Sequence, residues 1–466
     1  MAEPLIFEEK RREIEMERDV IIIGGGPAGM TTALTAKSVY PEKSVCLVKE
    51  IGDGVIPCAI PYMIHTMSDP DQNKMGDMPL ENAGVEIIVG KAVTLDTEES
   101  SVLLESGQVI FYERLVLATG NKPVLPPIPG IDKTGVFSIE KSLSAMSALR
   151  NEARKAKHVV ILGGGFIGAE FADELARGSD AEIHIVEKHP KLMEAAFDDE
   201  FCDQITSELS KSGAIIHTDK RASSIDGGIK AESVTLEGRK KIPADMVLIG
   251  IGGKPNTALA ERAGLRITDG GSIWVDSYMR TSVSNVFAVG DCALKRDFFT
   301  RHEVPVWLAS TATAEARIAG TNIYGIRVLR KIQGTIAAFS TRIGNVSFAS
   351  AGFTSRIADD EKFRWVSATA TAPDRHPGTL PGAFEVKVKL VVAERSGIIL
   401  GGQMSGGVSV GELINIVALA IQKEVTVSEL DMMQIATHPL LTSAPTVYPL
   451  INAAQQALAK LRAGAK

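Results

Sequence analysis

The chain has 466 residues, of which 45% are apolar and 23% charged, and its formal net charge is −7. This length allows about three domains, and the negative charge argues against a nucleic-acid partner. No apolar run reaches the roughly 18 residues of a membrane span, and the mixed-charge N-terminus has no apolar segment of the secretory type. We therefore expect a cytoplasmic protein without a membrane or nucleic-acid partner. Residues 1–18 are expected to form a short polar extension, for which a helix is one option.

One strand–turn–helix–strand theme occurs twice. Apolar runs predict buried parallel strands at 20–23 and 159–162, and each run leads into a glycine-rich turn and a helical pattern. The runs 44–48 and 182–186 predict the strand that closes each unit. Because only two such units occur, roughly 140 residues apart, the sequence indicates a duplicated α/β architecture rather than a repeat array.

Later segments of the chain change in character. A short strand is predicted over 285–291 and a longer alternating strand over 383–392. Helical patterns follow at 410–422 and 450–461. This mixture predicts a third domain of the α+β kind from about residue 334 onward.

The first glycine-rich turn, 24–29, fits the pattern GxGxxG directly after a strand. Glycines at these positions permit a tight turn, let the backbone approach a pyrophosphate, and allow the next helix to pack on the strand. The helix N-terminus then faces the phosphate charge. Glu50, which follows the second strand, suits a carboxylate that accepts hydrogen bonds from a ribose. The predicted dinucleotide contacts are Gly24, Gly26, Pro27, Ala28, Gly29 and Glu50.

The second glycine-rich turn, 163–168, repeats this arrangement, and Glu187 follows its second strand. A carboxylate at that place favours a free ribose 2′-hydroxyl over a 2′-phosphate, and therefore NADH. Lys188 and His189 lie beside it and keep NADPH open as an alternative. Two dinucleotide sites in one chain indicate hydride transfer between their cofactors. The contacts predicted here are Gly163, Gly165, Phe166, Ile167, Gly168 and Glu187.

Three further segments carry a family resemblance. Residues 115–120 look like the ATG segment that closes a flavin domain, residues 248–257 look like its nicotinamide-domain counterpart, and residues 286–291 look like a second FAD segment. With the two turns, they resemble the pyridine nucleotide-disulfide oxidoreductase family over nearly the whole chain after about residue 19. The resemblance implies FAD at the first turn, NADH or NADPH at the second, and Asp291 on the ribityl chain. The cofactor contacts that it adds are Ala118, Thr119, Gly120, Gly252, Gly290, Asp291 and Ala309.

Finer matches single out one cysteine. Residues 57–62, PCAIPY, resemble the CxxPY element of coenzyme A-disulfide reductases, NADH oxidases and persulfide reductases, and residues 308–320 resemble another segment of the same branch. These relatives use a single redox cysteine, which corresponds to Cys58. This residue lies just ahead of an expected short helix, whose N-terminus should lower the pKa of the Cys58 thiol. The alternative for Cys58 is the ordinary one, a small buried apolar side chain.

The other three cysteines are expected to be structural. Cys46 lies in an expected strand, Cys202 lies in a helical pattern, and Cys292 follows Asp291 directly. The chain has no CxxC or CxxxxC spacing, which argues against both a zinc cluster and a vicinal dithiol. We therefore expect no metal site.

Three residues are candidates for acid–base or positioning roles near Cys58. Tyr62 lies four residues further on and is suited either to a hydrogen bond near the sulfur or to packing. Glu170 follows the second glycine turn, and in the relatives a glutamate there lies near the nicotinamide and the flavin, where it would orient the carboxamide; a plain position on the helix surface is the alternative. The segment THPLLT around His438 resembles an element in which a histidine from the second subunit acts as acid–base for the thiols. The glutamate that usually follows is Ser443 here, which leaves a structural role for His438 open.

The resemblance implies a fold of two Rossmann-like dinucleotide-binding domains and a C-terminal α+β dimerisation domain, and hence a homodimer. We expect the FAD-binding domain over 19–135 and 276–333, and the NAD(P)H-binding domain over 136–275. The interface domain is expected over 334–466.

The activity that follows is the passage of electrons from NADH through FAD to Cys58. The acceptor would be a low-molecular-weight disulfide, persulfide or polysulfide, and coenzyme A is a candidate ligand because the resemblance includes coenzyme A-disulfide reductases. An NADH oxidase with oxygen as acceptor is the alternative enzyme. A flavin-binding redox sensor or electron-transfer component is the alternative of another class.

Overall fold

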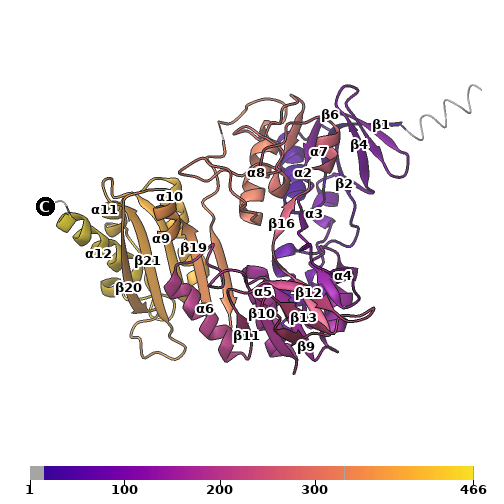
Figure 1. Ribbon diagram of the computed structural model, residues 1–466. Coiled ribbons are helices and arrows are strands. Elements are labelled where there is room, and N and C mark those ends of the chain that lie inside the picture. The colour runs from indigo at the N-terminus through magenta and orange to yellow at the C-terminus, as the bar shows by residue number, and fades with distance from the viewer. Residues whose placement is uncertain (1–14, 330, 465–466) are drawn as a thin grey trace, which may run out of the picture.

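The computed structural model describes residues 15–329 and 331–464 and shows three units (Figure 1). Two units are built on largely parallel sheets, and the third is built on an antiparallel sheet. The first unit draws on distant parts of the chain, because β17 (Val286–Ala288) pairs in parallel with β6 (Val109–Leu117). The sheets confirm the expected α/β class with a C-terminal α+β unit.

The first unit comprises β1 (Glu15–Ile23), β2 (Val45–Lys49), β3 (Glu86–Val89), β4 (Ala92–Asp96), β5 (Ser101–Leu104), β6, β17, α2 (Pro27–Val39), α3 (Met78–Asn82), α7 (Ala258–Arg262), α8 (Ala309–Asn322) and the 3-10 turns η1 (Pro57–Ala59), η2 (Pro61–Met63), η3 (Pro70–Asn73) and η4 (Gly290–Cys292). Its sheet has the order β3-β2-β1-β6-β5-β4, with β17 beside β6. Helices α2 and α8 pack against each other, so a late segment of the chain lies beside the first glycine turn.

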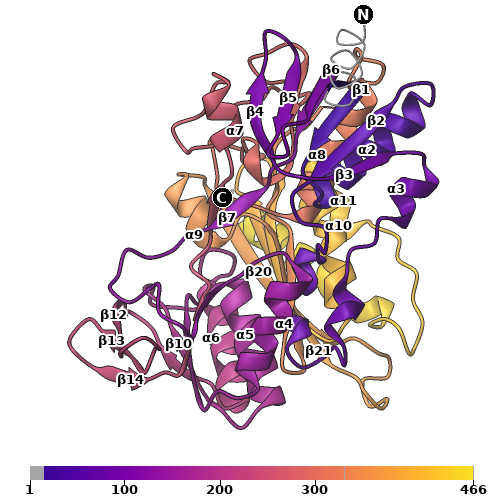
Figure 2. The same cartoon turned by 90° about the vertical axis from the view of Figure 1, so that its right-hand side faces the viewer.

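The second unit comprises β8 (Val136–Ser138), β9 (His158–Leu162), β10 (Glu182–Val186), β11 (Ile215–His217), β12 (Ala222–Asp226), β13 (Ser233–Leu236), β14 (Lys241–Pro243), β15 (Met246–Ile249), α4 (Leu143–Ala153), α5 (Phe166–Gly178) and α6 (Asp199–Lys211). Its parallel sheet has the order β11-β10-β9-β15-β8. The antiparallel strands β12, β13 and β14 form a separate sheet that packs through buried apolar side chains against β9, β10 and β15 (Figure 2). The chain crosses between the two units through β7 (Asn121–Pro123) and β16 (Gly253–Pro255), which pair with each other.

The third unit comprises β18 (Phe339–Ile343), β19 (Val346–Gly352), β20 (Trp365–Pro373), β21 (Glu385–Ala393), β22 (Ile399–Gly406), α9 (Ser355–Asp360), α10 (Val410–Gln422), α11 (Val427–Asp431), η5 (Pro445–Val447) and α12 (Pro449–Gly464). The order of its sheet is β18-β19-β22-β21-β20. Helix α10 packs on β19 and β22, and α12 packs on β20 and β21. Among the helices of the described residues, none combines the length and the apolar character that crossing a membrane requires.

The two glycine turns share one backbone geometry. Gly24 and Gly163 have φ values of +122° and +112°. A Cβ atom would lie 2.1 Å from the Ala118 carbonyl oxygen at Gly24, and 2.4 Å from the Gly250 carbonyl oxygen at Gly163. Only glycine adopts this conformation and tolerates this approach. The theme predicted twice from the sequence is therefore repeated in its local contacts.

Strand β1 begins earlier than predicted. Residues 15–18 were expected to belong to the polar extension, but Glu15 lies opposite Val109, and the pairing with β6 continues from there. A helix over these residues is therefore wrong, because β6 supplies their backbone partners. The rest of the predicted extension, 1–14, lies outside the described residues.

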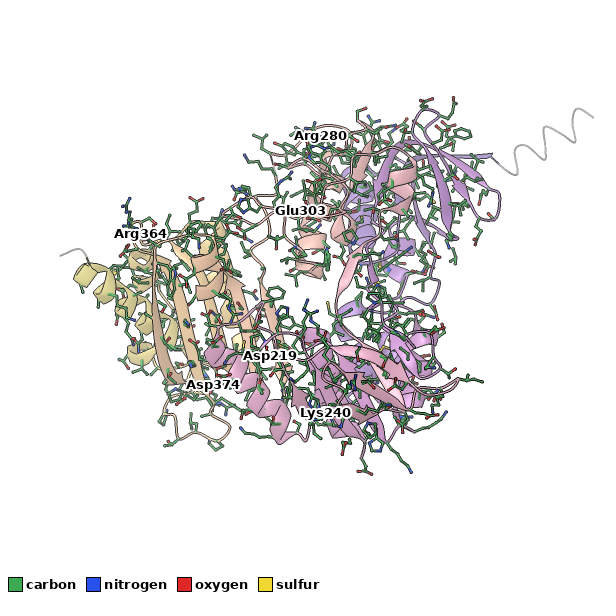
Figure 3. All side chains as sticks on the ribbon, in the orientation of Figure 1. Asp219, Lys240, Arg280, Glu303, Arg364 and Asp374 are labelled. Atoms are coloured by element: carbon green, nitrogen blue, oxygen red, sulfur yellow. The ribbon has the colours of Figure 1, made fainter. Side chains whose placement is uncertain are left out.

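Lys295 and Glu315 form a buried ion pair, whereas other charged side chains lie at the periphery of the molecule. Asp219 and Arg364 are exposed on the second and third units (Figure 3). The side chains of Lys295 and Glu315 are each only 2% exposed, and Nζ lies 3.0 Å from Oε2. The same Nζ donates to the Gly290 carbonyl, and Oε2 accepts from the Gly290 N–H. The pair therefore fixes η4 to α8.

Replacing Glu315 by glutamine should strongly destabilise the first unit. The change leaves the buried Lys295 ammonium without a counter-charge, which costs about 3–5 kcal/mol in comparable pairs. Urea unfolding measures the effect, and Asp203→Asn, which breaks an exposed pair with Lys191, is the control and should barely move the midpoint. Equal midpoints for the two variants would contradict the role assigned to the buried pair.

Candidate active site

The first glycine turn meets two later segments of the chain. Gly290 has a φ of +73°, and a Cβ atom on it would lie 2.8 Å from the Cβ of Ala28, so η4 packs directly on the start of α2. This contact brings Asp291 to the turn. Gly26, the N-cap of α2, would meet no atom within 4 Å of an added Cβ. An open helix N-terminus of this kind suits the pyrophosphate of a dinucleotide.

The carboxylate predicted for the ribose at this turn, Glu50, is not the side chain that packs on Gly25. Glu50 is exposed and pairs with Lys91 at 3.2 Å. The side chain that packs on the turn is Lys49, whose Cβ lies 2.7 Å from the position of a Cβ on Gly25. Its Nζ binds both oxygens of Asp77, at 2.7 and 2.6 Å. Lys49 is the last residue of β2 and Glu50 lies just beyond it, so the Lys49–Asp77 pair is the one that packs beside the turn.

At the second turn the predicted carboxylate is in place. Glu187 is 8% exposed, and its Oε2 accepts from the N–H of Gly164 at 2.6 Å while its Oε1 accepts from the N–H of His189 at 2.9 Å. Gly165, the N-cap of α5, is as open as Gly26. The turn thus presents a fixed negative charge beside an open helix N-terminus, which fits a ribose diol better than a ribose phosphate.

Three predicted contacts lie where the chain crosses between the units. The hydroxyl of Thr119 donates to the carbonyl of Asn256 at 2.6 Å, and the N–H of Asn256 donates to the carbonyl of Gly120 at 2.9 Å. Gly120 and Gly252 have positive φ values of +68° and +105°. The reciprocal bonds hold the two crossing segments together and so fix the relative placement of the two turns. The last predicted contact of the first unit, Ala309, is the first residue of α8.

Cys58 lies in η1, on the loop that follows β2. All four cysteines fall within the described residues, and Cys58 is exposed, whereas Cys46, Cys202 and Cys292 are buried. The ordinary alternative for Cys58, a buried apolar side chain, therefore does not hold. The structural role predicted for the other three agrees with their burial.

The loop that carries Cys58 is held from both sides by the second unit. The N–H of Val55 donates to the carbonyl of Lys141, just ahead of α4, at 3.2 Å. On the other side, Glu174 of α5 accepts from the backbone N–H and the hydroxyl of Thr66, both at 2.7 Å. These contacts tie the two ends of the loop that carries Cys58 to the second unit.

The pKa of the Cys58 thiol differs from the prediction. Burial by surrounding protein atoms raises the pKa of the Cys58 thiol, and the carboxylates of Glu170 and Asp291 raise it further, while Lys141 lowers it. The expected lowering by a helix N-terminus is wrong, because η1 has only three residues and a single turn carries little of the helix dipole. In this protein environment the thiol form is favoured.

Sequence reasoning missed Lys141. Its Nζ donates to Oδ1 of Asn121 at 3.0 Å, and Nδ2 of Asn121 donates to Oδ2 of Asp291 at 2.8 Å. Burial lowers the pKa of Lys141, while Asp291 and Cys58 oppose that effect. No local motif marks this lysine, because its partners lie far away in the sequence.

Glu170 influences the pKa values of both the Cys58 thiol and Tyr62. Burial raises the pKa of Glu170 to about 7, the hydrogen bond from Thr341 opposes this, and Glu174 adds to it. Burial raises the pKa of Tyr62 to about 12, with a contribution from Glu170. Glu170 is therefore a carboxyl that exchanges its proton near neutral pH, which suits acid–base chemistry. Tyr62 stays protonated.

His438 is exposed on the segment between α11 and η5. Its Nδ1 accepts from the N–H of Leu440 at 3.2 Å, and its carbonyl accepts from the N–H of Thr442 at 3.0 Å. With Nδ1 as acceptor, the neutral ring carries its proton on Nε2. These hydrogen bonds stay within the segment, and none of them joins His438 to the Cys58 loop of the same chain.

Comparison with known proteins agrees with this geometry. A family model described as pyridine nucleotide-disulphide oxidoreductase matches residues 18–316, and one for the dimerisation domain of that family matches residues 339–447. The chain is 31% identical to an NADH oxidase of Methanocaldococcus jannaschii over 95% of this chain and 99% of that one. It is 32% identical to an NAD(P)H coenzyme A polysulfide/persulfide reductase of Pyrococcus horikoshii over 84% of this chain and 88% of that one. Among solved structures, an NAD-dependent persulfide reductase from A. fulgidus is similar, with a TM-score of 0.88 and 28% identity over 96% of this chain and 84% of that one.

Replacing Glu170 by glutamine should make Cys58 more reactive. The change removes a negative charge that raises the pKa of the thiol, so the thiolate fraction at pH 8.5 should rise by about twofold to fivefold. The rate of iodoacetamide labelling, followed by mass spectrometry, measures it. Cys58→Ser should show no such labelling, and an unchanged rate in Glu170→Gln would argue against the coupling.

The affinity for FAD should show whether Asp77 or Glu50 contributes to binding at the first turn. If the Lys49–Asp77 pair meets the ribose, Asp77→Asn should raise the Kd for FAD by about tenfold, since it removes an anionic acceptor and leaves Lys49 unpaired. Glu50→Gln should leave the Kd unchanged, because Glu50 pairs with Lys91 away from the turn. Flavin fluorescence on titration of the apoprotein measures both, and a larger effect for Glu50→Gln would reverse the assignment.

Proposed function

We propose that this chain, which belongs to the pyridine nucleotide-disulphide oxidoreductase family, carries FAD at the β1–α2 turn and takes electrons from NADH at the β9–α5 turn. The observation that supports this most directly is the duplication of an open helix N-terminus, at Gly26 and Gly165. The charge of Glu187 at the second turn favours NADH over NADPH. The two cofactors supply hydride transfer, a chemistry that amino-acid side chains lack.

We propose that Cys58 passes the electrons to a low-molecular-weight disulfide, persulfide or polysulfide. When Cys58 is joined to a small thiol in a mixed disulfide, two electrons break the S–S bond and two protons yield the Cys58 thiol and the free small thiol. With a persulfide, the same balance releases sulfide. The exposure of Cys58 supports this role, as does the similarity to the polysulfide/persulfide reductase of Pyrococcus horikoshii.

The protons for this step have two candidate sources. Glu170 lies near Cys58 within the chain, and its pKa of about 7 lets it give up a proton at neutral pH. His438 of a second copy is the other candidate, since its Nε2 is free of the bond that engages Nδ1. The match to a dimerisation domain over 339–447 supports a homodimer, and we propose that this histidine reaches the thiol of the other copy.

An NADH oxidase is the second candidate, and the similarity to the enzyme of Methanocaldococcus jannaschii favours it. Oxygen would take two electrons to become peroxide. The Cys58 thiolate would then reduce peroxide to water and become a sulfenate, which a second NADH would return to the thiolate. In this case the electrons still come from NADH, and the final acceptors are oxygen and peroxide in place of a sulfur compound.

Replacing Cys58 by serine should separate these functions. Under nitrogen, the wild type should consume NADH steadily with one of coenzyme A disulfide, polysulfide or glutathione disulfide. Cys58→Ser should lose at least about a hundredfold of that rate, while NADH still bleaches its flavin absorbance. Reduction of a sulfur acceptor at the wild-type rate by Cys58→Ser would overturn the proposal.

The same experiment under air tests the alternatives. Consumption of NADH by the wild type with oxygen alone, together with hydrogen peroxide release by Cys58→Ser, would favour the oxidase. Flavin bleaching without steady NADH consumption by any acceptor would favour a redox sensor or electron-transfer component.

A further inference from the structure

An edge strand of the third unit forms one wall of the site around Glu170. Strand β18 lies at the edge of its sheet and packs on α5. Phe339 stacks on Phe166 with ring centroids 4.9 Å apart and an interplanar angle of 17°. Two residues further along β18, the Thr341 hydroxyl donates to Oε1 of Glu170 at 2.6 Å. Because i and i+2 of a strand share a face, as i and i+4 of a helix do, these contacts form one continuous surface.

The β18–β19 turn extends this surface by one more contact. The N–H of Gly344 donates to Oδ1 of Asp173 at 3.0 Å, and Asp173 is 1% exposed. The register of β18 on α5 is therefore set at three points, Phe339, Thr341 and Gly344. The hydroxyl of Thr341 is accordingly held opposite Glu170 by its surroundings.

We propose that Thr341 positions the carboxyl of Glu170 for hydride transfer from the nicotinamide, so that the third unit contributes to the nicotinamide site of its own chain. This inference rests on the proposed function at the β9–α5 turn. The nicotinamide ring gains positive charge as it gives up hydride, and a carboxylate aimed at the ring stabilises that charge. A hydroxyl that donates to Oε1 both fixes the direction of the carboxyl group and favours its charged form.

The charged and neutral forms of Glu170 have similar populations near neutral pH, so a single hydrogen bond can shift the ratio between them. Burial raises the pKa of Glu170 to about 7, and the bond from Thr341 opposes that rise. Arg342, the neighbour of Thr341 on β18, does not pair with Glu170; its Nε donates to the carbonyl of Gly344 at 3.2 Å. The other titratable groups around Glu170 are Asp173, Glu174 and Arg177 on α5, Cys58 on η1 and Tyr62 on η2.

The experiment is the pH dependence of anaerobic flavin reduction by NADH, measured by stopped flow on the FAD-loaded protein. Thr341→Val keeps the shape of the side chain and removes the donor, so the midpoint of the profile should rise by about one pH unit. The ionised fraction of Glu170 at pH 7 would then fall from about one half to about one tenth, and the rate should fall about fivefold. Thr341→Ser should restore the wild-type profile, which a loss of packing alone would not allow.

Two further variants complete the design. Thr369→Val makes the same change on β20, at the opposite edge of the same sheet, and should leave the profile unchanged. Glu170→Gln should slow flavin reduction and remove the pH step. If Thr341→Val loses its FAD, the comparison of Thr341→Ser with Thr341→Ala decides in its place.

The outcomes separate this inference from the proposed function. If Glu170→Gln slows flavin reduction and Thr341→Val matches the wild type, the inference about Thr341 is overturned and the role of Glu170 stands. If Glu170→Gln itself leaves reduction by NADH unchanged, the role proposed for Glu170 fails as well. A raised midpoint in Thr341→Val, with rescue by serine, supports the inference.

Discussion

The arrangement of this molecule depends on buried carboxylates along one face of helix α5. Glu174 and Asp173 are 0% and 1% exposed, and buried carboxylates are tolerated only where hydrogen bonds and counter-charges satisfy them. Their partners come from different units: Thr66 on the cysteine loop bonds to Glu174, and Gly344 on the β18–β19 turn bonds to Asp173. Arg177 binds both carboxylates, at 2.7 and 2.6 Å. Helix α5, which begins at the second glycine turn, thus also fixes the loop that carries Cys58 and the C-terminal sheet.

The two glycine turns have the same backbone and different charges. At both, a side chain from the end of the neighbouring strand covers the second glycine, but Lys49 covers Gly25 and Glu187 covers Gly164. The shared backbone geometry lets a pyrophosphate approach the helix N-terminus, and both dinucleotides contain a pyrophosphate. In the function proposed above, the side chains would meet the ribose, where the two sites would have different tasks: one retains its cofactor and the other exchanges it.

Features that depend on neighbouring residues along the chain could be predicted from the sequence. Strand runs, glycine turns and the two βαβ units were predicted because each is encoded within about thirty residues, and the PCAIPY segment singled out Cys58. Features that depend on tertiary contacts were missed. Lys141 and Thr341 reach the site from distant segments without a motif, and Lys49 at the end of β2, rather than Glu50 beyond it, packs on Gly25. The pKa of Cys58 was misjudged because burial and carboxylates from other segments outweigh the local helix turn.

The setting of Cys58 has a consequence for the idle protein. The residue is exposed, yet partial burial of the thiol and the nearby carboxylates raise its pKa and favour the protonated form. A protonated thiol is a poor nucleophile towards stray electrophiles and peroxide, which attack the thiolate. The chain can therefore leave its sulfur within reach of a substrate while sparing it from chance damage. In the function proposed above, a change of charge beside the sulfur during turnover would release the proton and so produce the reactive form only when it is needed.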